Sequence, residues 1–220
     1  MVLTAQQIQE IKDYIFDAVK YRETYHEVYD HMLNALADVQ EPYSLELVAE
    51  IINIDFGSFK EIKKQEALYQ QQVNKKYARL FLSELATTFK WPGILSNLTI
   101  LALCTCIYYS SKTAPFNMKP MIIAIFLCSI VVAFYVYSKI LLGKRKEQKY
   151  SITDNSLGSL ASVGLFMGNF VLYWFLTKDS LIDLSQNSKV ITMLVLFFFC
   201  SMYVRTFITF YNQKIKILTA

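Results

Sequence analysis

The chain has 220 residues, enough for one or two domains, of which 54% are apolar and 18% charged. An ordinary soluble domain is about 25% charged, so the composition argues against a uniformly soluble protein. Residues 1–92 hold 10 Lys or Arg and 14 Asp or Glu, a net −4, whereas residues 93–220 hold 12 and 4, a net +8. The positive charge is confined to short connections between apolar runs, so it suits lipid headgroups, and nucleic acid is not an expected partner.

The first predicted helix covers residues 4–19. Thr4 and Gln7 have the spacing of a capping box, and isoleucines then recur on one face. The start of the chain has neither the basic residues nor the apolar stretch of a cleavable signal peptide, so we expect this part to be retained.

Two further helices are predicted over residues 21–39 and 45–56. Pro42 separates them, Ser44 is a suitable N-cap for the second, and Gly57 can end it in a left-handed conformation. These elements predict a small helical domain.

A long helix is predicted to connect this domain, residues 1–57, to the rest of the chain. From Phe59 nothing breaks the helical pattern before Trp91-Pro92, and the connecting segment 58–91 ends in basic and aromatic residues that suit the headgroup region. Both a straight stalk and a helix that bends onto the membrane are compatible with this pattern.

Four apolar segments of about 20 residues follow, each long enough as a helix to cross a hydrocarbon core of about 30 Å. We therefore predict an all-α protein in which residues 92–220 form a four-helix transmembrane bundle. The expected spans are residues 92–111, 121–142, 157–176 and 190–211.

Lysine and arginine indicate the orientation of these spans, because they resist translocation in short loops. They are concentrated before the first span, in the tail and in the connection between the second and third spans. We expect these parts, and with them both termini, to be cytoplasmic in a multi-pass protein of the cell inner membrane. The connection holds Lys144, Arg145, Lys146 and Lys149.

Few polar side chains lie inside the predicted spans. Asn97 and Thr99 come early in the first, and Arg205 is close enough to the end of the fourth to snorkel. No ionisable residue is expected at the midplane, which disfavours an ion pump or proton relay. All four cysteines lie in the spans, where we interpret them as packing residues.

The third span contains a small-residue motif. Gly164 and Gly168 form a G-x-x-x-G pair that lets another helix approach closely, and the amide of Asn169 can hydrogen-bond across such a contact. We predict a helix-packing surface, either within the chain or in a homo-oligomer.

The stretch YHEVYDH holds both histidines, His26 and His31, together with Glu27 and Asp30. It resembles the H-E-x-x-H zinc signature but has one residue too many. Five residues turn a helix by about 500°, so the two histidines lie on opposite borders of the polar face and cannot share one ion. We therefore predict no metal, cofactor or catalytic residue here; a metal site would need further ligands from another helix or another subunit.

The spacing permits His26 to pair with Asp30 and Glu27 with His31. We interpret these four residues as partner-binding candidates on a polar face opposite a tyrosine-rich core face.

The run ETYHEVYDHMLNAL, followed by DFGSFKEIKK and a long polar helix, is similar to HAAS-type helical domains of uncharacterised bacterial membrane proteins. The E-x-x-D-H core is formed by Glu27, Asp30 and His31. The resemblance implies a signalling or interaction module, often partnered with PadR-like transcription regulators.

These observations predict a non-enzymatic membrane protein whose cytoplasmic domain binds a protein partner. The alternative is an accessory or gating subunit of a transporter or channel, which would need pore-lining polar residues. A lipid-processing enzyme would need a cluster of His, Asp or Glu near one membrane interface, and the sequence has none.

Overall fold

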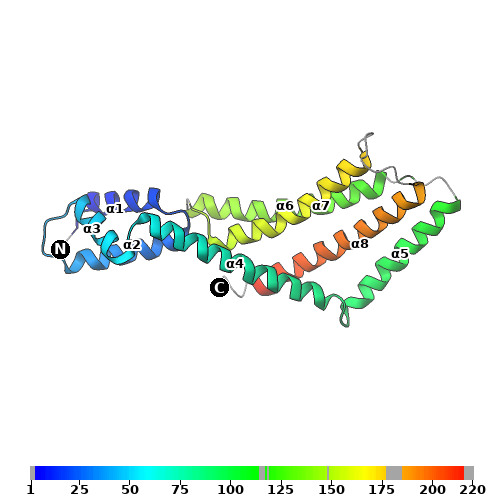
Figure 1. The fold of residues 1–220 in the computed structure, drawn as a ribbon, viewed down its shortest axis with the longest axis horizontal. Helices are drawn as coiled ribbons and strands as arrows, with labels where there is room; N and C mark the ends of the chain where they lie inside the picture. The colour runs from blue at the N-terminus through cyan, green and yellow to red at the C-terminus, as the bar shows by residue number, and fades with distance from the viewer. Residues whose placement is uncertain (1–2, 114–116, 118, 148, 177–184, 216–220) are drawn as a thin grey trace. The chain divides into compact units, whose positions relative to one another are not determined.

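The residues described by the computed structural model are 3–113, 117, 119–147, 149–176 and 185–215, and nearly all of them are helical (Figure 1). The predicted all-α class is confirmed: within these ranges no strand forms, and a single β-bridge pairs Tyr21 with Tyr150. The chain divides into two compact units, one formed by Met1–Lys75 with Ile140–Ser156 and one by Lys76–Lys139 with Leu157–Ala220.

Three helices of the first unit surround one apolar core: α1 (Ala5–Ala18), α2 (Arg22–Asp38) and α3 (Leu45–Phe56). Their buried side chains recur at the helical spacing expected from the sequence. The side chains with no exposed surface are those of Ile11, Ile15, Met32, Leu36 and Val48.

Local signals set the ends of these helices as predicted. The Thr4–Gln7 capping box at the start of α1 is confirmed. Ser44 caps α3 by accepting the backbone N–H of Leu47 at 3.1 Å. Gly57 ends α3 with a φ of 77°, which a residue with a side chain rarely adopts.

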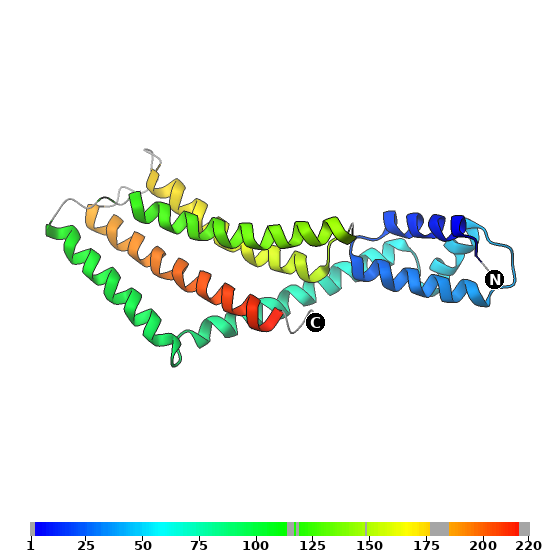
Figure 2. The ribbon, with the colours of Figure 1, turned by 180° about the vertical axis from the view of Figure 1, so that it is seen from behind.

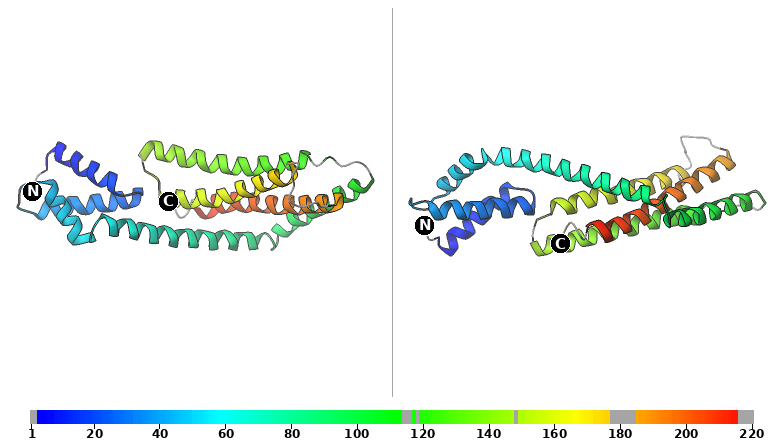
Figure 3. Two further views of the ribbon diagram at one scale, coloured as in Figure 1. Left: turned by 45° about the horizontal axis from the view of Figure 1, so that its top comes forward. Right: turned by 90° about the horizontal axis from the view of Figure 1, so that it is seen from below.

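The connecting helix, α4 (Phe59–Thr87), is one uninterrupted helix in both views of Figure 3. It ends at Thr87, before the break that the sequence predicts at Trp91-Pro92. The hydroxyls of Thr87 and Thr88 donate to the carbonyls of Glu84 and Leu85, and the backbone then continues with turns in place of helical bonds.

The second unit contains the apolar helices, except for the end of α6 and the start of α7, which belong to the first. They are α5 (Gly93–Thr113), α6 (Lys119–Glu147), α7 (Ile152–Leu176) and α8 (Gln186–Phe210), which continues in a π-helical turn, Tyr211–Ile215. Among the described residues, three helices are long and apolar enough to cross a membrane: α5, the Lys119–Leu142 part of α6, and α8 with its extension to Gln213. The helix α7, expected as the third span, is not one of these three.

Within the second unit, α5 and α8 run antiparallel (Figure 2). Arg205, near the end of α8, donates from Nη2 to Oδ1 of Asn97, near the start of α5, at 2.6 Å. Further along α5, the thiol of Cys104 lies 3.9 Å from the carbonyl oxygen of Leu194.

The helix α7 is antiparallel to both α6 and α8. The hydroxyls of Tyr137, late in α6, and Ser162, early in α7, are 3.2 Å apart. Tyr203, late in α8, donates its hydroxyl to the carbonyl of Leu160, early in α7, at 2.8 Å. The four helices of this unit therefore alternate in direction.

Candidate functional site

The four partner-binding candidates His26, Glu27, Asp30 and His31, here called the polar edge, are all exposed on α2. His31 does not pair with Glu27. Its Nε2 lies 2.9 Å from Oδ2 of Asp55 on α3. In the described part of the chain no hydrogen bond joins His26 to Asp30 either, so the intrahelical pairs that the spacing permits are not formed.

The ring of His31 is held in place by α3. It stands edge-on to Phe56 with 4.9 Å between ring centroids, so the imidazole bridges α2 and the end of α3. His26 contacts only its neighbour Tyr25 in this way, at 5.4 Å. Within the described ranges, no group of three or more His, Cys, Asp or Glu side chains could hold a metal ion.

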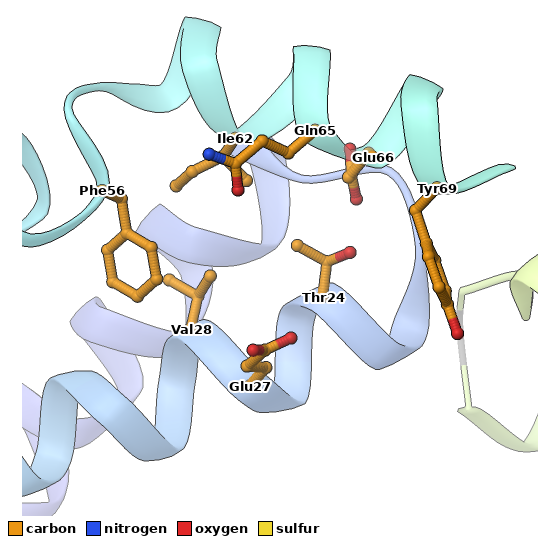
Figure 4. Close-up of a pocket in the computed structure, with 8 residues that line it drawn as sticks. All are labelled: Thr24, Glu27, Val28, Phe56, Ile62, Gln65, Glu66 and Tyr69. Carbon is orange, nitrogen blue, oxygen red and sulfur yellow. The ribbon is translucent and has the colours of Figure 1, made fainter. Parts of the chain in front are cut away.

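A pocket of about 260 Å³ opens beside the polar edge. Glu27, Thr24 and Val28 of α2 form one wall, and residues from the end of α3 and from α4 form the other (Figure 4). Its remaining lining residues are Phe56, Ile62, Gln65, Glu66 and Tyr69.

One of its two carboxylates is already engaged. Glu66 is only 5% exposed, and its oxygens accept the backbone N–H groups of Lys20 and Tyr21 at 3.1–3.2 Å. These donors lie in the turn just before α2, so the Glu66 carboxylate of α4 holds the connection between α1 and α2.

The other carboxylate is available. Glu27 is exposed and makes no hydrogen bond or ion pair with any described residue. Apolar surface from Phe56 and Tyr69 lies in the same pocket. This combination suits a cationic or N–H donor group carried on an apolar stem, such as an Arg or Lys side chain of another protein.

A second polar site of the first unit was not predicted. Lys149, from the connection between α6 and α7, donates to the carbonyl of Val19 at the end of α1 at 2.6 Å and lies 3.9 Å from the ring centroid of Phe16. Burial lowers the pKa of the Lys149 ammonium, an effect opposed by the carboxylates of Glu66 and Asp17.

The same connection is bound by Glu23 of α2. Its carboxylate accepts the hydroxyl of Ser151 at 2.5 Å and the backbone N–H of Ile152 at 3.1 Å, so it caps the start of α7. The backbone N–H of Arg22 donates to the carbonyl of Tyr150 at 3.0 Å. We call residues 149–152, with these bonds, the docked segment.

The docked segment could be predicted from the sequence only in part. Ser151 and Asp154 have helix-start spacing, which marks the beginning of α7. Nothing local marks Glu23, because its partners lie about 130 residues away. The basic residues between the second and third predicted spans were expected to face lipid headgroups. One of them, Lys149, instead binds the carbonyl of Val19 within the first unit.

The two glycines of α7 lie in close contacts inside the chain. A Cβ added at Gly164 would be 2.5 Å from the ring of Tyr203 on α8, and one added at Gly168 would be 3.1 Å from Cβ of Ser129 on α6. Asn169 is exposed and takes no part in these contacts.

The polar residues considered for a pore are engaged by the chain itself. Asn97 is buried, donates to the carbonyl of Thr88 at 2.9 Å and accepts from Arg205. Thr99 donates to the carbonyl of Leu95 in its own helix. Arg205, expected to snorkel, is thus bound to α5 through Asn97.

No family model, no curated protein and no solved structure matches the chain. The resemblance of the polar edge to HAAS-type domains therefore stays a prediction.

Proposed function

We propose that this chain is a non-enzymatic, four-span protein of the cell inner membrane whose cytoplasmic helical domain binds a protein partner. The observation that carries the proposal is the pocket beside the polar edge, with the unengaged carboxylate of Glu27 next to the apolar surface of Phe56 and Tyr69. Residues 1–92 have a net charge of −4, so the matching surface on the partner is basic.

Affinity purification of the full chain from its native membranes tests the partner-binding role. We expect Glu27→Arg to lose a partner that the unmodified chain retains, because it reverses the charge in the pocket. The matched control is Glu50→Arg, at an exposed glutamate of α3. A salt titration adds a second readout, because an exposed ion pair weakens as the Debye length shortens. The same partners with all three proteins would exclude the polar edge as a binding surface.

The packing of α7 supports the fourth span. It has 25 residues, about 38 Å of helix at 1.5 Å per residue, and runs antiparallel to α6 and α8, which are both long and apolar enough to span. Its residues 160–168 contact both of these helices, and a helix that packs between two spanning helices shares their environment. Four spans of alternating direction also place both termini on one side.

Labelling of single cysteines tests this topology. In a Cys106→Ser, Cys128→Ser background, which removes the two exposed cysteines, we expect Ser111→Cys and Ser185→Cys to react from outside the cell. Lys75→Cys should react only after permeabilisation. Labelling of positions 75 and 185 from the same side would show that α7 does not cross.

A further inference from the structure

The outward face of α7 carries a polar side chain beside apolar ones. Phe166 is 72% exposed, and Asn169, three residues later, is its neighbour on the same face; Val163, 49% exposed, lies on the other side of Phe166. The two glycines, by contrast, face α8 and α6. This exposed face therefore lies outside the close contacts that the glycines make.

Asn169 lies near the middle of the apolar unit. Its neighbour Gly168 packs against Ser129, which is close to halfway along the Lys119–Leu142 part of α6. In the proposed four-span arrangement the amide of Asn169 is then near the centre of the hydrocarbon, where lipid offers it no hydrogen-bond partner.

Three exposed hydroxyls of the apolar helices are satisfied by their own helix. Those of Thr99, Thr105 and Ser162 each donate to a backbone carbonyl three or four residues earlier, at 2.7–2.9 Å. Asn169 makes no hydrogen bond with any residue that the structure describes. Its amide has two N–H donors and a carbonyl acceptor, so it leaves more hydrogen-bonding groups without partners than a hydroxyl does.

We propose that this face of α7 binds the same face of a second copy of the chain, with Asn169 at the two-fold axis. An amide both donates and accepts, so two Asn169 side chains facing each other satisfy one another without any other polar group. Val163 and Phe166 supply the surrounding apolar contact. The inference rests on α7 crossing the membrane, as proposed above.

Step counting in single-molecule photobleaching of the full chain in lipid vesicles measures the dimer directly. We expect Asn169→Leu to weaken dimerisation by roughly tenfold, since interhelical amide bonds in membranes have about that effect. Asn169→Gln, which keeps the amide, should retain dimers. The control Thr105→Leu removes an exposed hydroxyl that is satisfied within α5, and should leave the dimer unchanged.

Disulfide cross-linking in the same Cys106→Ser, Cys128→Ser background locates the interface. Phe166→Cys should form a cross-linked dimer that disappears when Asn169→Leu is added. Val131→Cys, on the exposed face of α6, should form none.

Two outcomes overturn the inference: monomers of the unmodified chain at every protein-to-lipid ratio, or dimers that neither depend on Asn169 nor cross-link at position 166. A failure of the four-span proposal is distinguishable, because it would show in the labelling of position 185. Monomers with intact labelling would refute only the dimer.

Discussion

The hydrogen bonds of Glu23 hold the docked segment against α2. We therefore predict that substituting Glu23 makes this segment detach more often. The carboxylate of Glu23 accepts two hydrogen bonds, from the Ser151 hydroxyl and the Ile152 backbone N–H. Glu23→Gln keeps one acceptor oxygen and loses the charge. Glu23→Ala loses both acceptors and leaves the start of α7 with only its own cap, the Ser151 hydroxyl that accepts the N–H of Thr153 at 3.2 Å.

The magnitude follows from the exposure of the carboxylate. A buried hydrogen bond to a charged group contributes about 1.5–3 kcal/mol. The side chain of Glu23 is 41% exposed, so solvent reduces each bond to about 1 kcal/mol. We expect Glu23→Gln to lower the free energy of local opening by about 1 kcal/mol and Glu23→Ala by about 2 kcal/mol. The opening equilibrium then rises about fivefold and thirtyfold, and the backbone amide hydrogens exchange faster by the same factors.

Hydrogen–deuterium exchange of the full chain, followed by mass spectrometry of the peptide covering residues 149–156, measures this opening. The control is Glu27→Ala, one helical turn along α2, whose carboxylate bonds to no described residue. If the peptide exchanges at the same rate in Glu23→Ala and Glu27→Ala, the docked segment is not held by Glu23 and the reasoning fails.

Three further predictions concern stability and are checked by thermal unfolding of the purified full chain. Glu66→Ala should lower the free energy of unfolding of the first unit by about 2–4 kcal/mol, because it leaves two backbone N–H groups without their acceptor. Glu61→Ala, which breaks an exposed ion pair on the same helix, should cost less than about 1 kcal/mol, and equal losses would show that Glu66 does not stabilise the turn before α2. Burial, and secondarily the nearby Glu10 carboxylate, raises the pKa of Tyr43, so its neutral form stabilises the fold below about pH 10 and this contribution is lost as the pH rises above that value. As the pH rises above about 10, the Tyr43→Phe variant should therefore lose less stability than the unmodified chain, and identical pH profiles would count against this. Gly164→Ala should cost about 1–3 kcal/mol through its clash with the ring of Tyr203, and Tyr203→Leu should restore part of the loss; a neutral Gly164→Ala would show that the two helices are not in close contact.

Features encoded by neighbouring residues could be predicted from the sequence. Thr4, Ser44 and Gly57 act on groups within four residues of themselves, so their spacing was sufficient to place the helix ends. The core face of α2 can also be derived from periodicity alone, because its buried residues Val28, Met32 and Leu36 are each four apart.

Features that depend on the tertiary fold could not be predicted. His31 pairs with Asp55 because α3 folds back onto α2, and no spacing rule within one helix contains that contact. The roles of Glu23 and Glu66 have the same origin: each carboxylate accepts a backbone N–H from a segment outside its own helix. In sequence, both look like ordinary glutamates of polar helices.

The docked segment also has a consequence for the order of synthesis. The turn between α1 and α2 leaves the ribosome early, yet residues 149–152, which bind it, are made only after two apolar helices have been translated. Until then the carbonyl of Val19 lacks the ammonium of Lys149, and the carboxylate of Glu23 lacks both of its donors. The N-terminal helices can form as soon as they emerge. Their unit is complete only after α6 has been made and residues 149–152, which follow it, bind to α1 and α2.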